Sequence, residues 1–136
     1  MFRGAISLNQ DISNWDVSSV TDMSGMFASS FFYQPIGKWN VVRVGNMYLM
    51  FYYAAAFNQP IGNWNITAVE DIKNMFTGVT LSTTNYDATL LGWSGQIVQN
   101  GVVFSGGNSQ YTSPSVARDT LINTYGWTIT DGGTAP

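Results

Sequence analysis

A repeat of about 25 residues is the feature of this sequence that most constrains its fold. The dipeptide Met-Phe begins at Met1, Met26, Met50 and Met75, so its four copies are spaced by 25, 24 and 25 residues. Further columns of matching residues keep the same intervals: Gln10, Gln34 and Gln59; Ile12, Ile36 and Ile61; Trp15, Trp39 and Trp64; Val17, Val41 and Ile66; Val20, Val44 and Val69; Met23, Met47 and Ile72. Self-similarity at a period of roughly 20 to 50 residues indicates stacked units that share one core.

Each unit contains two local patterns of apolar residues. Trp15 and Val17 alternate with polar residues, and this period of two predicts a strand with one buried face. Val20, Met23 and Phe27 then recur at positions i, i+3 and i+7, which predicts one apolar stripe of a short helix. The second and third units repeat both patterns. We therefore expect each unit to consist of a strand, a turn, a helix and a return loop, with successive strands paired in parallel.

Helix boundaries are also marked in the sequence. Thr67 and Glu70 are spaced as a capping box, which predicts a helix start in the third unit. The segment NYDATLLGW predicts a further helix that begins at Asn85. Ser113, followed by a proline, predicts the start of another helix, and Gly126 predicts its end.

The length of 136 residues fits a single domain. We assign residues 1–25, 26–49 and 50–74 to three repeats, and residues 75–136 to enlarged and altered capping repeats at the C-terminal end. Within that last part, Val102-x-Phe104 and Trp127-x-Ile129 are again 25 residues apart, which indicates one more altered unit. End units of such arrays are atypical because they must close the core against water.

The repeat resembles that of a known family. The pattern M-F-x-x-x-x-x-F-N-Q-x-I-x-x-W-x-V-x-x-V-x-x-M, with the segments YDATLLGWSGQ, FSGGNSQYTS and GWTITDGG, is similar to the BspA-like leucine-rich repeat group of bacterial surface proteins. The same 25/26-residue repeat is described in mycoplasma and listerial lipoproteins. The resemblance covers essentially the whole chain, and the sequence departs from the pattern at Leu8 in the first unit and at Phe32 and Tyr33 in the second.

This resemblance implies a fold and a role. The implied fold is an α/β repeat, a leucine-rich-repeat-like solenoid with a parallel strand ladder, short helices on the other face and an atypical C-terminal cap. The resemblance also implies that the protein is secreted or lies on the cell surface, and that it acts in adhesion or partner binding. The family has no catalytic motif to carry over, so we expect no enzyme.

Composition narrows the possible functions further. Only 10% of the residues are charged, the net charge is −3, and the five basic residues are scattered, so no electrostatic track for nucleic acid is expected. The sequence has neither cysteine nor histidine, which removes the thiolate nucleophile, the imidazole base and the usual zinc ligands. We expect no catalytic residue, no cofactor and no metal.

No run reaches the roughly 20 apolar residues of a membrane-spanning helix, and the first residues lack the features of a signal peptide. We expect any export signal to lie outside this segment. The chain is then either an excised piece of a longer protein or begins at a methionine that coincides with the repeat.

A first candidate binding surface lies on the outward positions of the predicted strands. Repeat surfaces of this kind often bind partners. Its candidate residues are Asn14, Asp16, Lys38, Asn40, Asn63 and Asn65. The alternative is a solvated ladder of amides that bridge one another.

A second candidate surface lies on the predicted helix of the second unit. Leu49, Tyr52 and Tyr53 project outward or sideways there, where the neighbouring units carry small or polar residues. Clustered exposed apolar residues in a soluble protein indicate an interface. The alternative is that the loop after Phe51 folds back and covers them.

Two functions from different classes follow. The first is a non-catalytic surface module that binds a protein or glycan partner through its repeat surface. The second is a structural subunit that associates with its own copies through an open N-terminal end and the tyrosine-rich surface. Calcium binding by Asp11, Asp16 and Asp22, or glycoside hydrolysis by two of the eight acids, is disfavoured because no ligand loop and no carboxylate pair is singled out.

Overall fold

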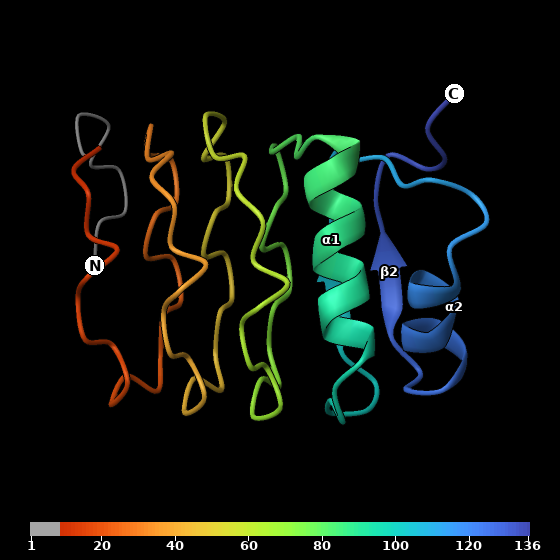
Figure 1. Cartoon of the computed structure of the whole chain (residues 1–136), viewed down its shortest axis with the longest axis horizontal. Coiled ribbons are helices and arrows are strands. Elements are labelled where there is room, and N and C mark those ends of the chain that lie inside the picture. The colour runs from red at the N-terminus through yellow and green to blue at the C-terminus, as the bar shows by residue number, and fades with distance from the viewer. Residues whose placement is uncertain (1–8) are drawn as a thin grey trace.

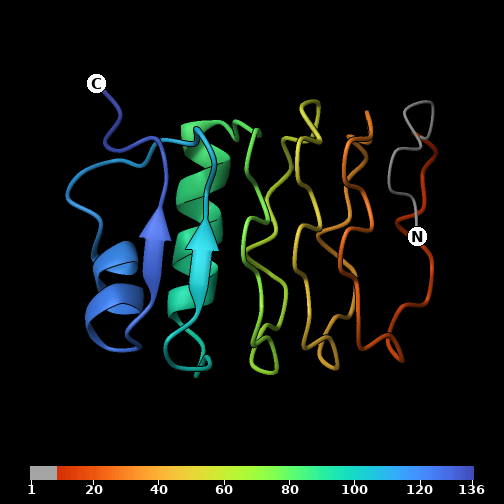
Figure 2. The ribbon, with the colours of Figure 1, turned by 180° about the vertical axis from the view of Figure 1, so that it is seen from behind.

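The computed structural model describes residues 9–136, in which the chain runs as successive coils side by side from the N-terminal to the C-terminal end (Figure 1). The helices and strands are α1 (Thr83–Ser94), β1 (Val103–Ser105), α2 (Val116–Asn123) and β2 (Thr128–Thr130). β1 and β2 form a parallel two-stranded sheet with Phe104 opposite Ile129 (Figure 2). The 25-residue spacing therefore predicted the register of this pair. The repeat positions Met1 and Leu8, and the expected open N-terminal end, lie outside the described residues.

The predicted leucine-rich-repeat-like solenoid, with a ladder of strands and helices on the opposite face, is wrong. Between residues 9 and 82 the chain forms turns and irregular segments, without a helix or a strand. Pairing in this part consists of isolated parallel bridges between Asp22 and Asn46 and between Asn46 and Asp71, and Ile72 makes another with Phe104. The regular elements are confined to the C-terminal part of the described residues.

Left-handed backbone conformations explain why the predicted helices are absent. Gly25, Leu49 and Asn74 occupy the same place in three units and have φ values of 63°, 58° and 57°. Four positions later, Ser29 and Tyr53 have φ values of 57° and 55°. A right-handed helix cannot pass through such residues. The i, i+3, i+7 pattern therefore arises here from a chain that turns twice.

Hydrogen bonds between units replace the helical ones in this segment. The backbone N–H groups of Met23, Gly25 and Phe27 donate to carbonyl groups of the next unit, at distances of 2.8–2.9 Å. Met47 and Phe51 donate in the same way to Asp71 and Met75, each one unit further along the chain, at 2.7 and 3.0 Å. The polar backbone groups are thus satisfied across the stack in the segment that the apolar pattern had assigned to a helix.

The predicted Trp-x-Val strands are irregular segments, each lying between two turns. The N–H groups of Trp15, Trp39 and Trp64 each donate to the carbonyl of the isoleucine three residues earlier, at 3.0–3.1 Å. Directly after each tryptophan, an Asp or Asn side chain accepts from the N–H group two residues further on, as Asn65 does from Thr67. Such side-chain bonds compete with strands and helices. Thr67 is therefore part of a turn and starts no helix.

Aromatic side chains make the core continuous from unit to unit. Phe51 stacks between Phe27 and Phe76, with ring centroids 5.6 and 5.3 Å apart. The Trp39 indole N–H donates to the Ile12 carbonyl at 3.1 Å, and Trp64 repeats this bond to Ile36 at 2.9 Å. Both indoles are buried as predicted. Trp15 differs, with 47% of its surface exposed.

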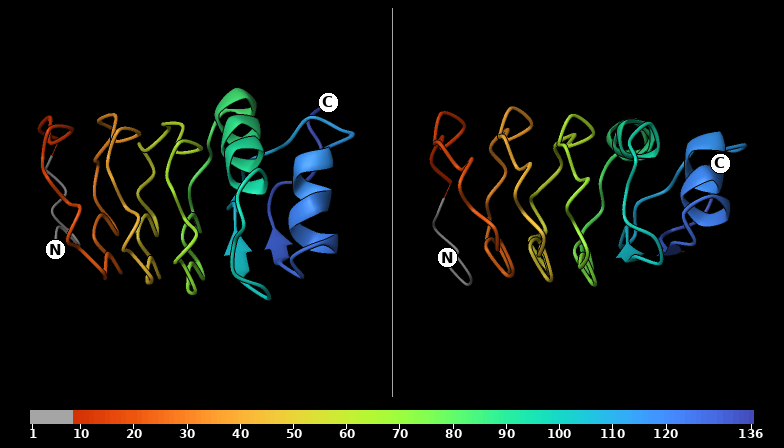
Figure 3. Two further views of the ribbon diagram at one scale, coloured as in Figure 1. Left: turned by 60° about the horizontal axis from the view of Figure 1, so that its bottom comes forward. Right: turned by 90° about the horizontal axis from the view of Figure 1, so that it is seen from below.

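Helix α1 takes the place that residues 57–64 occupy in the third unit. The Trp93 indole donates to the Ile61 carbonyl at 3.1 Å, which repeats the bond that Trp64 makes to Ile36. The backbones at Gly62 and Gly92 touch, and a Cβ atom on either glycine would overlap the other segment. In the view from below, the helices lie on one side of the stack and the strands on the other (Figure 3).

The starts of both helices differ slightly from the predictions. Ser82 caps α1 by accepting from the Asn85 N–H at 3.2 Å, so the helix begins before Asn85. Ser115 caps α2 by accepting from the Arg118 N–H at 3.1 Å, in the role predicted for Ser113. Gly126 follows α2 with φ 68°, as a helix-ending glycine should.

Candidate functional site

Three of the six residues predicted for the first surface line one cleft. Asn14, Lys38 and Asn63 occupy the same place in successive units, and all three are exposed. Together with their neighbours they enclose about 270 Å³. The other lining residues are Ser13, Pro35, Gly37, Gln59 and Pro60. We call this feature the corner cleft.

Stacked β-turns build the corner cleft. The turns that end at Trp15, Trp39 and Trp64 have Asn14, Lys38 and Asn63 as their last central residues. Because the units stack in register, the three turn tips form a column. These residues were predicted to lie on strands, whereas they lie in turns.

The polar groups of the corner cleft are largely unengaged within the protein. Among the described residues, no hydrogen bond or ion pair involves the side chains of Asn14, Lys38 or Asn63. Gln59 donates through Nε2 to the Tyr33 carbonyl at 2.8 Å, which leaves its Oε1 atom free to accept. The cleft can therefore offer an ammonium group and several amides to a ligand.

The other three predicted residues serve the backbone instead. Asp16, Asn40 and Asn65 are exposed, and each accepts a hydrogen bond from the N–H group two residues later at 3.0–3.1 Å. None of them lines the corner cleft. Their side chains shape the turns that follow the tryptophans.

The second predicted surface lies on a turn and not on a helix. Leu49 and Tyr52 are partly buried, while Tyr53 is 55% exposed. The Tyr53 ring lies over Gly78 and meets the Tyr52 ring edge-on, with centroids 4.6 Å apart. The two tyrosines thus cover part of each other and leave one ring half in solvent. We call Leu49, Tyr52 and Tyr53 the tyrosine surface.

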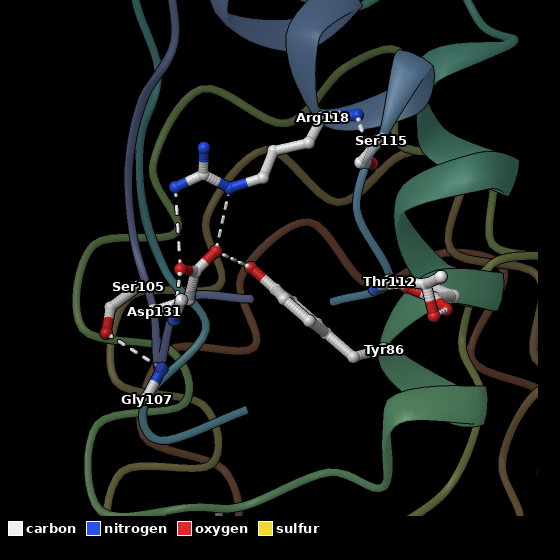
Figure 4. Close-up of polar contacts among 9 residues, drawn as sticks. Tyr86, Ser105, Gly107, Thr112, Ser115, Arg118 and Asp131 are labelled. Atoms are coloured by element: carbon white, nitrogen blue, oxygen red, sulfur yellow. Dashed lines mark hydrogen bonds and ion pairs between the residues drawn. The ribbon is translucent and has the colours of Figure 1, made fainter. Parts of the chain in front are cut away.

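Sequence reasoning missed a buried polar network at the C-terminal end (Figure 4). The Tyr86 hydroxyl of α1 donates to Asp131 Oδ2 at 2.7 Å, and Arg118 of α2 donates to the same oxygen through Nε at 2.9 Å. The Gly133 N–H donates to Asp131 Oδ1 at 3.0 Å. The guanidinium of Arg118 also lies 4.6 Å from the centre of the Tyr111 ring. No local pattern could have joined Tyr86 to a residue so distant in the sequence.

Burial and charge set the protonation of this network. Burial, followed by the hydrogen bond to Asp131, raises the pKa of the Tyr86 hydroxyl above its ordinary value of 10.0. For Arg118, burial lowers the pKa, but the hydrogen bond and attraction to Asp131 outweigh this, and the net change is upward. Arg118 therefore stays charged and Tyr86 stays neutral, and their hydrogen bonds to Asp131 tie α1, α2 and the segment after β2 together.

The three acids for which calcium binding was considered and disfavoured are engaged separately. Asp11, Asp16 and Asp22 accept from the N–H groups of Ser13, Ser18 and Ser24 at 3.0, 3.0 and 2.8 Å. Within residues 9–136, no group of three or more acids is placed to hold a metal ion. These carboxylates form turns in the first unit.

Hydrogen bonds to serine lower the pKa of Asp16 and of Asp22 below the ordinary 3.8. A lowered folded-state pKa means that each bond contributes fully above 3.8 and is lost as the pH falls through the folded value. We expect the amide resonances of Ser18 and Ser24 to titrate with midpoints below 3.8. In Asp16→Asn, which copies Asn40 of the second unit, the Ser18 titration should vanish and that of Ser24 should persist. A midpoint at or above 3.8 would contradict the turn assignment.

Residues 1–90 match the family described as "Mycoplasma protein of unknown function, DUF285". The chain belongs to this family, which agrees in a general way with the resemblance to mycoplasma repeat proteins but does not single out the BspA-like group. No curated protein and no solved structure matches the chain. Among the residues that the structure describes, no helix combines the length and apolar character needed to cross a membrane.

Proposed function

We propose that this chain is a non-catalytic interaction module of a bacterial cell-surface or secreted protein of the BspA-like kind. In this proposal the chain binds a protein or glycan partner through the corner cleft and catalyses no reaction. The supporting observation is the column of turn tips, in which the side chains of Asn14, Lys38 and Asn63 lack partners within the described part of the protein. Unpaired polar groups that converge on a cleft suit ligand recognition, since they can make bonds that the fold does not need.

A binding screen with matched variants tests this proposal. The purified chain is applied to arrays of glycans and extracellular proteins, and any ligand retained is titrated against Asn14→Ala/Asn63→Ala. We expect the double variant to bind at least about tenfold more weakly, because two sets of amide hydrogen bonds are removed. Asn123→Ala, at an exposed position on α2, is the control and should bind as the unaltered chain does. Retention of no ligand, or equal binding by the double variant, would refute the proposal.

A second candidate function is self-association through the tyrosine surface. Leu49 has a left-handed backbone conformation at the position that Gly25 and Asn74 occupy in the neighbouring units. Tyr53 has one at the position of Ser29 and Gly78. Such conformations cost of order 1–3 kcal/mol for ordinary residues. Large residues kept at strained positions are typical of functional surfaces, and here the surface around the half-exposed Tyr53 ring would receive another copy of the chain.

Replacing both residues by those of the third unit separates assembly from stability. We expect Leu49→Asn/Tyr53→Gly to raise the free energy of unfolding by about 0.5–2 kcal/mol, since both new residues tolerate the left-handed region. Light scattering should then show concentration-dependent association for the unaltered chain and a monomer for the variant. The control Tyr48→Ser copies Ser24 of the first unit and should associate normally. A concentration-independent monomer of the unaltered chain would rule out self-association.

A further inference from the structure

We infer that the ligand of the corner cleft is a sugar residue that carries a carboxylate, held by Lys38 between the amides of Asn14 and Asn63. This inference rests on the proposed function, which assigns binding to the cleft, and adds the chemical class of the ligand. Three features of the cleft support it: its charge, its mixture of polar and apolar lining groups, and its size.

The charge of the lining favours an anion. Lys38 is the one charged residue among those that line the corner cleft, and within residues 9–136 no acid forms an ion pair with it. In the first unit, Asp11 takes the place of Pro35 and Pro60 in the repeat, and its Oδ1 accepts from the Ser13 N–H at 3.0 Å. An ammonium group that has no acidic partner attracts a carboxylate.

The remaining lining groups suit a polyhydroxylated ring. The amides of Asn14 and Asn63 each offer donors and an acceptor, and a sugar hydroxyl can satisfy both kinds of group. The rings of Pro35 and Pro60 supply apolar surface for the C–H groups of the same ring. The volume of about 270 Å³ lies just below the roughly 300–1,000 Å³ of drug-sized pockets, so the cleft fits a single ring at the end of a chain.

The geometry of the cleft disfavours an extended peptide. Peptides are usually bound by an unpaired strand edge or by an apolar groove that holds side chains. The cleft lies on β-turn tips, where the N–H groups of Trp39 and Trp64 are already used within the turns. Pro35 and Pro60 are the apolar residues that line it.

Titration with two sugars that differ only in charge tests the inference. The ¹⁵N-labelled full chain is titrated with sodium glucuronate and with glucose, and the side-chain amide resonances of Asn14, Gln59 and Asn63 are followed. We expect glucuronate to bind about fivefold more tightly than glucose, the scale of one solvent-accessible ion pair. The preference should shrink as salt is added, because ions screen an exposed charge.

Variants from the repeat itself provide the controls. Lys38→Asn copies Asn14 and Asn63, so it should keep the turn and lose the preference for glucuronate while still binding glucose. Lys73→Asn removes an exposed lysine outside the cleft and should keep the preference. Equal binding of both sugars by the unaltered chain, or an unchanged preference in Lys38→Asn, would overturn the inference. Equally tight binding of acetate, or of a short peptide with a free C-terminal carboxylate, would overturn it as well.

The two proposals fail in distinguishable ways. If a partner from the arrays depends on Asn14 and Asn63 while the cleft shows no preference for glucuronate, the ligand class is wrong and the interaction module stands. If the array ligand is insensitive to those asparagines and the sugars leave their amide resonances unmoved, both proposals are wrong.

Discussion

Replacing Phe51 by alanine should lower the free energy of unfolding by about 3–5 kcal/mol, the usual cost of removing a fully buried aromatic ring. Phe51 is 0% exposed and contacts rings of three units. Its centroid lies 5.6 Å from Phe27, 4.0 Å from Phe57 and 5.3 Å from Phe76. The cavity left by alanine would therefore interrupt the aromatic stack at its centre. Urea unfolding followed by tryptophan fluorescence measures the change.

Phe31→Ala is the matched control for this experiment. Phe31 belongs to the same residue type but is 58% exposed, so its removal should change the free energy of unfolding by less than about 0.5 kcal/mol. If Phe51→Ala fails to fold, Phe51→Leu keeps most of the volume and should still cost more than Phe31→Ala. Equal stability of the buried and exposed variants would contradict the assigned core.

Replacing Asp131 by alanine should destabilise the C-terminal part of the chain by about 3–5 kcal/mol, because it leaves a buried charge without its partner. The Asp131 side chain is 2% exposed and that of Arg118 is 18% exposed, so solvent screens this ion pair weakly. The variant also deprives the Tyr86 hydroxyl of its acceptor. Urea unfolding measures the loss of stability. Relative to the unaltered chain, we expect amide hydrogen exchange to accelerate in α2 and β2 and to change little in the units before residue 80.

Asp119→Ala is the control for the buried pair. Asp119 lies exposed in the first turn of α2, where a carboxylate contributes well under about 1 kcal/mol through the helix dipole. A loss in Asp131→Ala no larger than that in Asp119→Ala would show that the network does not hold the C-terminal part together. Uniformly faster exchange along the whole chain would instead indicate that the chain unfolds as one unit.

The pattern of apolar residues predicted the core well but misassigned its backbone. Ile36, Trp39, Val44 and Phe51 are all buried, as the 25-residue repetition of their columns indicated, whereas Trp15 of the Trp39 column is 47% exposed. The same columns did not yield the local conformation, since an i, i+3, i+7 pattern fits both a helix and a chain that turns at Leu49 and Tyr53. Periodicity reports which side chains face inward, and it reports the path between them only when the backbone is regular.

The candidate site was partly predictable for a related reason. Asn14, Lys38 and Asn63 stood out as polar residues in one repeat column, and repetition alone was sufficient to bring them together. Their position on β-turn tips, and the proline rings that complete the cleft, follow from how the turns stack. The tyrosine surface was recognised by its departure from the neighbouring units, although a turn carries it and not a helix.

By itself, the sequence determined the length of the unit, the residues of the core, the two C-terminal helices and the register of Phe104 with Ile129. These features depend on repetition along the chain and on local capping, and both are visible in the order of the residues. Only the tertiary structure decided where the hydrogen bonds between units fall and which charges are buried. The N–H of Met23 finds its acceptor in the next unit, and Asp131 finds Tyr86 and Arg118 on two different helices. Such partners are distant along the chain, so only folding brings them together and no local sequence pattern predicts them.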